Sequence, residues 1–194
     1  MPHGFKVIKP EIRILGIDDG IFIPHTKSWV PIIGVVFRGG YWLDGVMHTH
    51  ILVDGFDGTE KISSMILSSP HYKQLSVIML NGITFAGFNI VDMKTLNAAT
   101  KLPVIAVTRE KPDLVSVHEA LKHLSQSEER WQTILNAGEL SEISSRNKVE
   151  KIYLHVVGAS LDDAVKIVKL TSTRSNIPEA LRVAHLIASG ISHV

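Results

Sequence analysis

The feature that most constrains the fold is a change of hydrophobic pattern near residue 57, where successive strands give way to alternating helices and strands. Before that point, three apolar stretches follow one another without a helical pattern between them. They cover residues 11–20, 30–40 and 41–55, and Gly39-Gly40 between the last two predicts a hairpin turn. The first part of the chain therefore predicts an antiparallel three-strand meander.

After residue 57, segments with apolar residues at helical spacing alternate with short buried strands. The expected strands are 75–82, 102–110 and 151–159. The expected helices are 57–69, 88–100, 113–126, 127–138, 160–172 and 178–190. Helices that connect successive strands act as crossovers, so this half of the sheet is expected to be largely parallel. The sequence predicts an α/β fold, with a mixed sheet that contains the meander and carries helices on both faces.

Composition and missing motifs limit the classes of function. The 194 residues suffice for one full core, so we expect a single domain over residues 1–194. A net charge of +1 gives no general basic field for nucleic acids, although a local basic patch is compatible with it. The absence of cysteine excludes disulfides and thiolate nucleophiles. With neither a signal peptide nor a membrane-length apolar run, the chain is expected to be cytoplasmic and to have no membrane contact.

Carboxylates gather where the predicted strands end, which is where open α/β sheets place their sites. The first strand ends in Asp18-Asp19, the third leads into Asp54 and Asp57, and the fourth ends in Asn81. Several carboxylates at one sheet edge suit Mg²⁺, which prefers hard oxygen ligands. Two such ions about 4 Å apart can stabilise both the attacking and the leaving oxygen in phosphodiester cleavage.

Structural interpretations of the same carboxylates remain open. Asp19 is followed by glycine, and so is Asp54, which makes both good turn residues. Asp57 is a good helix N-cap, and Glu60 stands three residues later, as a capping box requires. The coincidence of two acidic glycine corners at two strand ends favours the metal site.

Other polar and aromatic side chains near the strand ends leave alternatives open. Arg38 could bind a phosphate bidentately or pair with a nearby aspartate. His48 and His50 share one strand face, but no third ligand accompanies them, so a solvated face is the simpler interpretation. Tyr41 could stack on a base or close an interface.

Six ordered segments, spread over nearly the whole chain, resemble the archaeal family known as domain of unknown function 99. They are LGIDDG, GVVFRGG, DGFDGTEKISSMI, LNGITFAGFNIVD, PVIAVTREKPD and IPEALRVAHLIASG. That family looks like a distant relative of endonuclease V, whose members have a ribonuclease H-like fold. Those enzymes cleave deaminated DNA or RNA near inosine, using magnesium that carboxylates hold. The resemblance implies a ribonuclease H-like, endonuclease V-like sheet here and a metal-dependent cleavage of phosphodiesters.

The resemblance also implies roles for individual residues. Asp18 matches the strand-one aspartate that is the central metal ligand of endonuclease V. Asp57 or Glu60 stands where the enzyme has a glutamate ligand, and the choice between them stays open. Asn81, in LNG, replaces an aspartate ligand, and His185, in IPEALRVAH, replaces an acidic residue. Losing two carboxylates weakens divalent-cation binding, and an imidazole suits Mn²⁺ or Zn²⁺ better than Mg²⁺.

These considerations lead to explicit expectations for the site. The candidate metal ligands, for Mg²⁺ or Mn²⁺, are Asp18, Asp57 and Asp54. The candidate catalytic residues are Asp18, Asp57, Asn81 and His185. The candidate substrate-binding residues are Arg38, Thr84 and Asn89. His185 is expected to transfer a proton, because an imidazole titrates near neutral pH.

Two functions follow as hypotheses. The first is metal-dependent phosphodiester cleavage of DNA or RNA. The alternative is a catalytically degenerate module of the same fold that binds a nucleic acid or a protein, which the replacements at Asn81 and His185 motivate. Formation of a homo-oligomer is compatible with either hypothesis.

Overall fold

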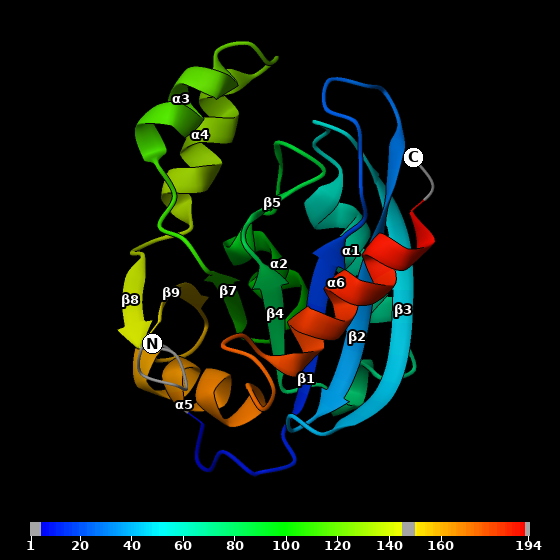
Figure 1. Cartoon of the computed structure of the whole chain (residues 1–194), viewed down its shortest axis with the longest axis vertical. Helices are drawn as coiled ribbons and strands as arrows, with labels where there is room; N and C mark the ends of the chain where they lie inside the picture. The colour runs from blue at the N-terminus through cyan, green and yellow to red at the C-terminus, as the bar shows by residue number, and fades with distance from the viewer. Residues whose placement is uncertain (1–4, 145–149, 193–194) are drawn as a thin grey trace.

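The computed structural model describes residues 5–144 and 150–192. A seven-stranded mixed sheet forms its centre, in the order β3-β2-β1-β4-β7-β9-β8 (Figure 1). The strands of this sheet are β1 (Arg13–Asp19), β2 (Trp29–Arg38), β3 (Trp42–Leu52), β4 (Val77–Asn81), β7 (Val104–Thr108), β8 (Ser141–Ser144) and β9 (Lys151–Val157). A separate hairpin consists of β5 (Thr84–Phe85) and β6 (Asn89–Ile90).

Helices cover both faces of the sheet, as predicted. They are α1 (Gly58–Ser68), α2 (Met93–Thr100), α3 (Leu114–Leu121), α4 (Ser127–Asn136), α5 (Leu161–Thr171) and α6 (Glu179–Ile191), with a 3-10 turn η1 at Tyr72–Gln74. Residues of α1 to α4 belong to the core on one face, and residues of α5 and α6 to the core on the other. The α3–α4 pair extends beyond one end of the sheet (Figure 1). Within the described ranges, no helix is both long and apolar enough to cross a membrane.

The predicted antiparallel meander is confirmed. β2 pairs antiparallel with β1 and with β3, so β3 runs in the same direction as β1. The interior of β1 is completely buried, which explains its apolar run up to Asp18. Gly16 in β1 lets α6 approach closely, because a Cβ atom there would lie 2.4 Å from the carbonyl carbon of Ala180.

The second half of the sheet is parallel only in part. β4 pairs parallel with β1 and β7, but β9 pairs antiparallel with β7 and β8. The expectation of a largely parallel half was therefore wrong for β9. The connection from β7 contains α3, α4 and the unpredicted edge strand β8, and it returns the chain in the opposite direction.

The helix predicted over 88–100 begins later than expected. Its first residues form β6 instead, and α2 starts at Met93. Asp92 caps it, since its carboxylate accepts hydrogen bonds from the backbone N–H groups of Lys94 and Thr95.

Strand direction determines where the polar residues meet. Because β1, β3, β4 and β7 all run the same way, their carboxyl ends lie at one edge of the sheet. Asp18, Asn81 and Thr108 stand at this edge, and the loop that follows β3 carries Asp54 and Asp57 to it.

Candidate active site

Three of the predicted catalytic residues meet at the carboxyl edge of the sheet. Oδ2 of Asp18, on β1, accepts a hydrogen bond from Nδ2 of Asn81 at 3.0 Å and lies 2.9 Å from Nδ1 of His185. Oδ1 accepts from the backbone N–H of Asp19 at 3.0 Å. Asn81 ends β4 and His185 lies on α6, so three distant elements supply this group, which we call the Asp18 cluster (Asp18, Asn81 and His185).

Asp18 and His185 differ strongly in their exposure to solvent. The side chain of Asp18 is 3% exposed, whereas that of His185 is 61% exposed. Burial raises the pKa of the Asp18 carboxyl above its ordinary value, and the hydrogen bonds from Asn81 and Asp19 and the nearby His185 oppose that rise. A buried carboxylate thus holds Nδ1 of an exposed imidazole and leaves Nε2 on the side away from it.

Asp19 connects the end of β1 to the end of β3. Its Oδ2 accepts a hydrogen bond from the backbone N–H of Ala86 at 2.5 Å, and the Ala86 carbonyl accepts from the N–H of Asp54 at 2.9 Å. Ala86 has a φ of 44°, in the left-handed region that alanine rarely adopts. Burial raises the pKa of Asp19 to about 6, and the neighbouring Asp18 charge adds to the rise. Asp19 therefore does more than form a turn with Gly20.

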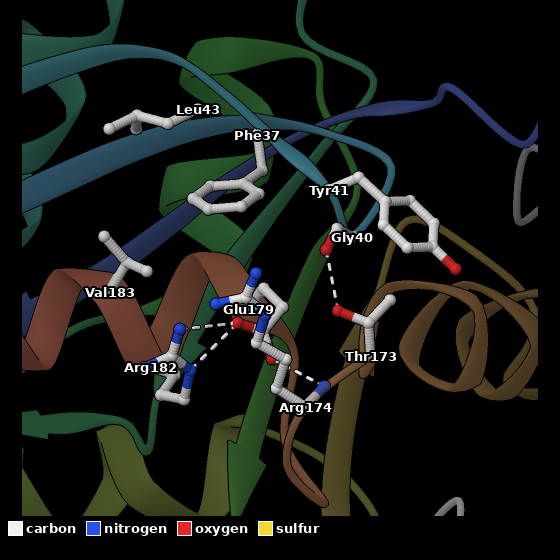
Figure 2. Close-up of a pocket in the computed structure, with 9 residues that line it drawn as sticks. All are labelled: Phe37, Gly40, Tyr41, Leu43, Thr173, Arg174, Glu179, Arg182 and Val183. Atoms are coloured by element: carbon white, nitrogen blue, oxygen red, sulfur yellow. Dashed lines mark hydrogen bonds and ion pairs between the residues drawn. The ribbon is translucent and has the colours of Figure 1, made fainter.

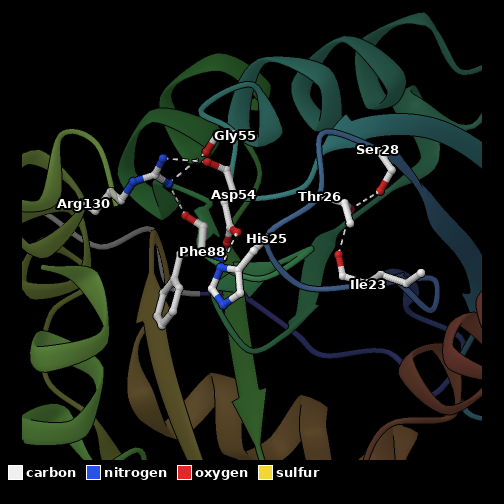
Figure 3. Close-up of polar contacts among 8 residues, drawn as sticks. All are labelled: Ile23, His25, Thr26, Ser28, Asp54, Gly55, Phe88 and Arg130. Atoms are coloured by element: carbon white, nitrogen blue, oxygen red, sulfur yellow. Dashed lines mark hydrogen bonds and ion pairs between the residues drawn. The ribbon is translucent and has the colours of Figure 1, made fainter. Parts of the chain in front are cut away.

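Asp54 lies at a second strained position of the same edge. Its φ is 51°, and its Oδ1 accepts a hydrogen bond from the N–H of Phe88 at 2.8 Å. Nδ1 of His25, whose own φ is 61°, lies 3.9 Å from Oδ2 of Asp54 (Figure 3). His25, Asp54 and Ala86 thus concentrate left-handed backbone at one place, as functional sites frequently do.

Arg130, from α4, joins the two loops that carry these residues. Its guanidinium donates to the carbonyls of Asp54 at 2.6 Å, of Gly55 at 3.0 Å and of Phe88 (Figure 3). It also lies over the ring of Phe56, 3.8 Å from the ring centroid. Because Arg130 is buried, it holds both loops in place from the protein interior.

Asp57 occupies the N-cap position of α1 but makes no capping hydrogen bond, so the capping-box interpretation with Glu60 was wrong. Its Oδ1 accepts from Leu52 N–H at 3.2 Å and from Nδ2 of Asn89 at 2.7 Å. Its Oδ2 is buried and has no hydrogen-bond partner among the described residues. Asn89 is fully buried and also accepts from Gly58 N–H at 2.9 Å, so it orients Asp57 from the protein interior.

Arg38 lies away from the Asp18 cluster. In the antiparallel register Arg38 stands opposite Arg13, about 17 Å of strand from Asp18. Its Nε lies 3.4 Å from Oδ2 of Asp44, and its guanidinium lies over Trp42. Of the two interpretations of Arg38, the structure therefore shows the pairing with an aspartate, which is Asp44.

Thr84 stands three residues beyond Asn81, exposed on the short strand β5. His48 and His50 are exposed on the edge strand β3, with their rings edge to face. The expected substrate contact of Thr84 stays a prediction, and no third ligand joins the two histidines within the part of the chain that the structure describes.

The oxygen and nitrogen atoms at this edge suit a cation that takes few of its ligands from the protein. No group of three His, Cys, Asp or Glu residues in ranges 5–144 and 150–192 is placed to hold a metal alone. The Asp18 cluster nevertheless combines a carboxylate, an amide and an imidazole, and Oδ2 of Asp57 lacks a partner. Mg²⁺ and similar cations often bind through one or two carboxylates together with waters and substrate phosphates. The residues therefore fit such a shared cation better than a closed cage of protein ligands.

Two residues of this edge were not predicted from the sequence. Arg130 follows Glu128 and Glu129, where an exposed, solvated arginine is the default interpretation. Its spacing of four residues from the buried Ile134 was the available signal, since both lie on the same face of α4. His25 lies in a loop, and nothing in the sequence pattern marks it.

Comparison with known proteins identifies relatives over nearly the whole chain. A family model described as endonuclease dU matches residues 10–192. A UPF0215 protein of Methanothermobacter thermautotrophicus is 50% identical over 191 residues, which cover 98% of this chain and 92% of that protein. A crystal structure of an Archaeoglobus fulgidus protein of unknown function superposes with a TM-score of 0.84 at 35% identity, covering 94% of this chain and 99% of that one.

More distant structures share the fold. Endonuclease V of Bacillus subtilis has a TM-score of 0.63 at 12% identity, with 96% of this chain and 84% of that one covered. Endonuclease V of Ciona intestinalis, in complex with a DNA that contains an inosine, has a TM-score of 0.58 at 15% identity and covers 89% and 82%. The predicted ribonuclease H-like, endonuclease V-like fold is thereby confirmed.

Proposed function

The chain belongs to the endonuclease dU family, and on this premise we propose that it cleaves phosphodiesters of DNA or RNA beside a deaminated base, with the help of a divalent cation. The observation that carries the proposal is the Asp18 cluster, in which one buried carboxylate oxygen meets an amide and an exposed imidazole. Such a group combines an anion for a cation with a residue that can transfer a proton.

Each residue of the Asp18 cluster has a definite part in this proposal. Asp18 would hold the cation, with Oδ2 of Asp57 as a further acceptor, and the cation would stabilise the negative charge of the phosphodiester. Asn81 fixes the orientation of the Asp18 carboxylate through its 3.0 Å hydrogen bond. In this proposal the Nδ1 of His185 faces Asp18 at 2.9 Å, and its Nε2 would exchange a proton with water or with a leaving oxygen.

The names of relatives select the bases to test. The family description contains dU, which we take as deoxyuridine, and the Ciona structure holds a DNA with an inosine. Deoxyuridine and inosine both carry a carbonyl where the parent base carries an amino group. A deaminated base is therefore the substrate feature that we propose.

The test uses purified protein and three end-labelled strands that differ only in one central base: deoxyuridine, inosine or the unmodified base. Each strand is incubated with Mn²⁺, with Mg²⁺ and with EDTA, both alone and annealed to a complement. We expect cleavage of a deaminated strand with a divalent cation, and none with EDTA. The absence of cleavage from all strands under both cations would contradict the proposal.

A binding module without catalysis is the second candidate. The observation that favours it is the absence, among the described residues, of three clustered His, Cys, Asp or Glu ligands. Isothermal titration with Mn²⁺ distinguishes the two, because a binding module takes up no stoichiometric cation. Stoichiometric uptake by the wild type that Asp18→Asn removes would exclude this second candidate.

A further inference from the structure

A cavity of about 440 Å³ lies directly beside the Asp18 cluster. Asn81 and His185 form one part of its lining, so it opens onto two of the three cluster residues. Arg109, which follows β7, and Arg182, which lies on α6, line it as well. The cavity thus places two guanidinium groups next to the proposed cleavage site, while Glu110 adds one carboxylate to its rim.

Arg109 carries the least compensated positive charge in this cavity. It is exposed, and no described residue forms a hydrogen bond or an ion pair with it. Oγ1 of Thr108, the preceding residue, is buried without a hydrogen-bond partner in the described part of the chain. The exposed guanidinium of Arg109 and the neighbouring hydroxyl of Thr108 therefore suit an anionic ligand that can also form hydrogen bonds.

Arg182 is held rigidly between this cavity and a second one. Its Nε and Nη2 lie 2.9 Å and 2.7 Å from Oε2 of Glu179, whose side chain is only 3% exposed. Oε1 of Glu179 accepts from the backbone N–H of Arg174 at 2.9 Å, which fixes the carboxylate in turn. Nη1 of Arg182 donates to no described residue and remains available to a ligand.

A second cavity, of about 530 Å³, is drawn in Figure 2. Arg182 lines both cavities. Its lining adds Arg174 and Tyr41, both of which are exposed. The hydroxyl of Thr173 donates to the carbonyl of Gly40 at 2.7 Å and joins the two sides of this cavity (Figure 2). The two cavities adjoin at Arg182 on α6, with His185 in the lining of the first and Tyr41 in that of the second. We call the two adjoining cavities the groove.

We propose that this groove binds a single nucleic-acid strand that leaves the Asp18 cluster, with Arg109 and Arg182 on phosphates and Tyr41 stacked on a base. Phosphodiesters are the ligand class because guanidinium groups match their geometry, and an exposed aromatic ring stacks on any base. The inference rests on the proposed function, since the groove gains its meaning from the neighbouring cleavage site. Beyond the proposed function, the inference states the path of the nucleic-acid strand and names three contact residues outside the Asp18 cluster.

The test measures binding in EDTA, where cleavage does not occur. A fluorescein-labelled single strand with one deoxyuridine is titrated with protein at several salt concentrations, and anisotropy gives the affinity. Arg109→Gln is expected to weaken binding about fivefold to tenfold and to lower the slope of log affinity against log salt by about 0.7, since one phosphate contact is lost. Tyr41→Ala is expected to weaken binding about tenfold without changing the salt slope.

The matched control is Lys166→Gln, which removes one exposed positive charge on α5. Arg182 itself is left intact, because its loss would leave the buried Glu179 without its cation. If Arg109→Gln and Tyr41→Ala bound as Lys166→Gln does, or if the wild type bound no strand, the groove would be refuted. Cleavage by the wild type that survives unchanged in both variants would refute the groove and leave the proposed function standing. A wild type that binds through the groove but never cleaves would refute only the proposed function.

Discussion

At the scale of single residues, the main feature is a pair of adjacent carboxylates, of which Asp18 is buried and Asp19 is partly buried. Asp18 and Asp19 end β1, and burial raises the pKa of each. The hydrogen bonds that they accept come from an amide side chain, backbone N–H groups and one imidazole, not from lysine or arginine. The negative charges of Asp18 and Asp19 therefore lower the stability of the fold. This is common at sites that a cation or a substrate completes.

Asp19→Asn tests this cost through the pH dependence of stability. Since the pKa of Asp19 rises from 3.8 to about 6 on folding, the wild type binds the extra proton when folded, and its stability falls as pH rises from about 4 to about 6. The variant lacks this loss, and asparagine can still accept from Ala86. We expect its free energy of unfolding at pH 7.5 to exceed that of the wild type by up to about 3 kcal/mol.

Urea denaturation at pH 3.5 and pH 7.5 provides the measurement. The difference between the two proteins should nearly vanish at pH 3.5, where Asp19 is protonated in the folded wild type. A variant that is no more stable than the wild type at pH 7.5 would show that burial does not penalise the Asp19 charge.

At the scale of elements, two sets of contacts, one from α4 and one from α6, hold the edge of the sheet together. α4 contributes Arg130, whose guanidinium bonds three backbone carbonyls of the loops after β3 and β5. α6 contributes His185 and packs tightly on Gly16 of β1. Both sets of contacts join segments that lie far apart in the sequence, and one substitution can disrupt each of them.

Arg130→Met removes the guanidinium contacts of α4 and keeps much of the apolar part of the Arg130 side chain. The carbonyls of Asp54, Gly55 and Phe88 then lose their donor, and we expect the free energy of unfolding to fall by about 3 kcal/mol. Gln132→Met, on the exposed face of the same helix, is the control and should change stability by less than about 0.5 kcal/mol. Equal stability of the two variants would mean that Arg130 does not hold the loops.

Gly16→Ala tests the contact between β1 and α6. The added Cβ would lie 2.6 Å from the backbone nitrogen of Leu181, so the helix must shift, and we expect a loss of about 3 kcal/mol. Gly190→Ala, in α6 but with no atom within 4 Å of the added Cβ, should instead stabilise the protein by about 0.5 to 1 kcal/mol. Thermal unfolding of both variants is the check, and a stable Gly16→Ala would contradict the close packing.

What could be predicted from the sequence follows from how each element is stabilised. The meander and the longer helices bury apolar side chains at regular spacing, so their pattern is visible in the chain. β8 has the sequence SEIS and no fully buried residue, and its pairing with β9 relies on backbone hydrogen bonds that leave no periodic signal. The antiparallel direction of β9 depends on how the long connection from β7 returns, which local pattern does not encode.

The same reasoning applies to the site. The resemblance to endonuclease V named Asp18, Asn81 and His185, and the structure brings these three together. The role of Asp19 and the loop contacts of Arg130 were not predictable, because their partners are backbone groups of distant loops. A backbone N–H or carbonyl has no residue identity and so leaves no trace in a motif.

At the scale of the whole molecule, the net charge of +1 conceals an uneven distribution. The buried Asp18 and the partly buried Asp19 lie at the carboxyl edge of the sheet, and arginines line the groove beside them. In the proposed function a cation binds the first region and a phosphate strand the second, and the two meet at the Asp18 cluster.

Cation binding should therefore stabilise the whole fold. At a Mn²⁺ concentration of about 100 times its dissociation constant, we expect the wild type to gain about 3 kcal/mol, and its melting temperature to rise by several degrees. Asp18→Asn should show little or no rise under the same conditions. Equal shifts in both proteins would place the bound cation elsewhere in the molecule.

The most direct test of the central claim is the single-turnover cleavage rate of a deoxyuridine-containing strand in Mn²⁺, compared between Asp18→Asn and Asp162→Asn. Asp162 is an exposed aspartate on α5, so its substitution makes the same chemical change away from the sheet edge. We expect Asp162→Asn to cleave at the wild-type rate and Asp18→Asn to be slower by a factor of about 10³ or more, while both keep the wild-type circular dichroism spectrum. Cleavage by Asp18→Asn at the wild-type rate would contradict the assignment of the catalytic centre to the Asp18 cluster.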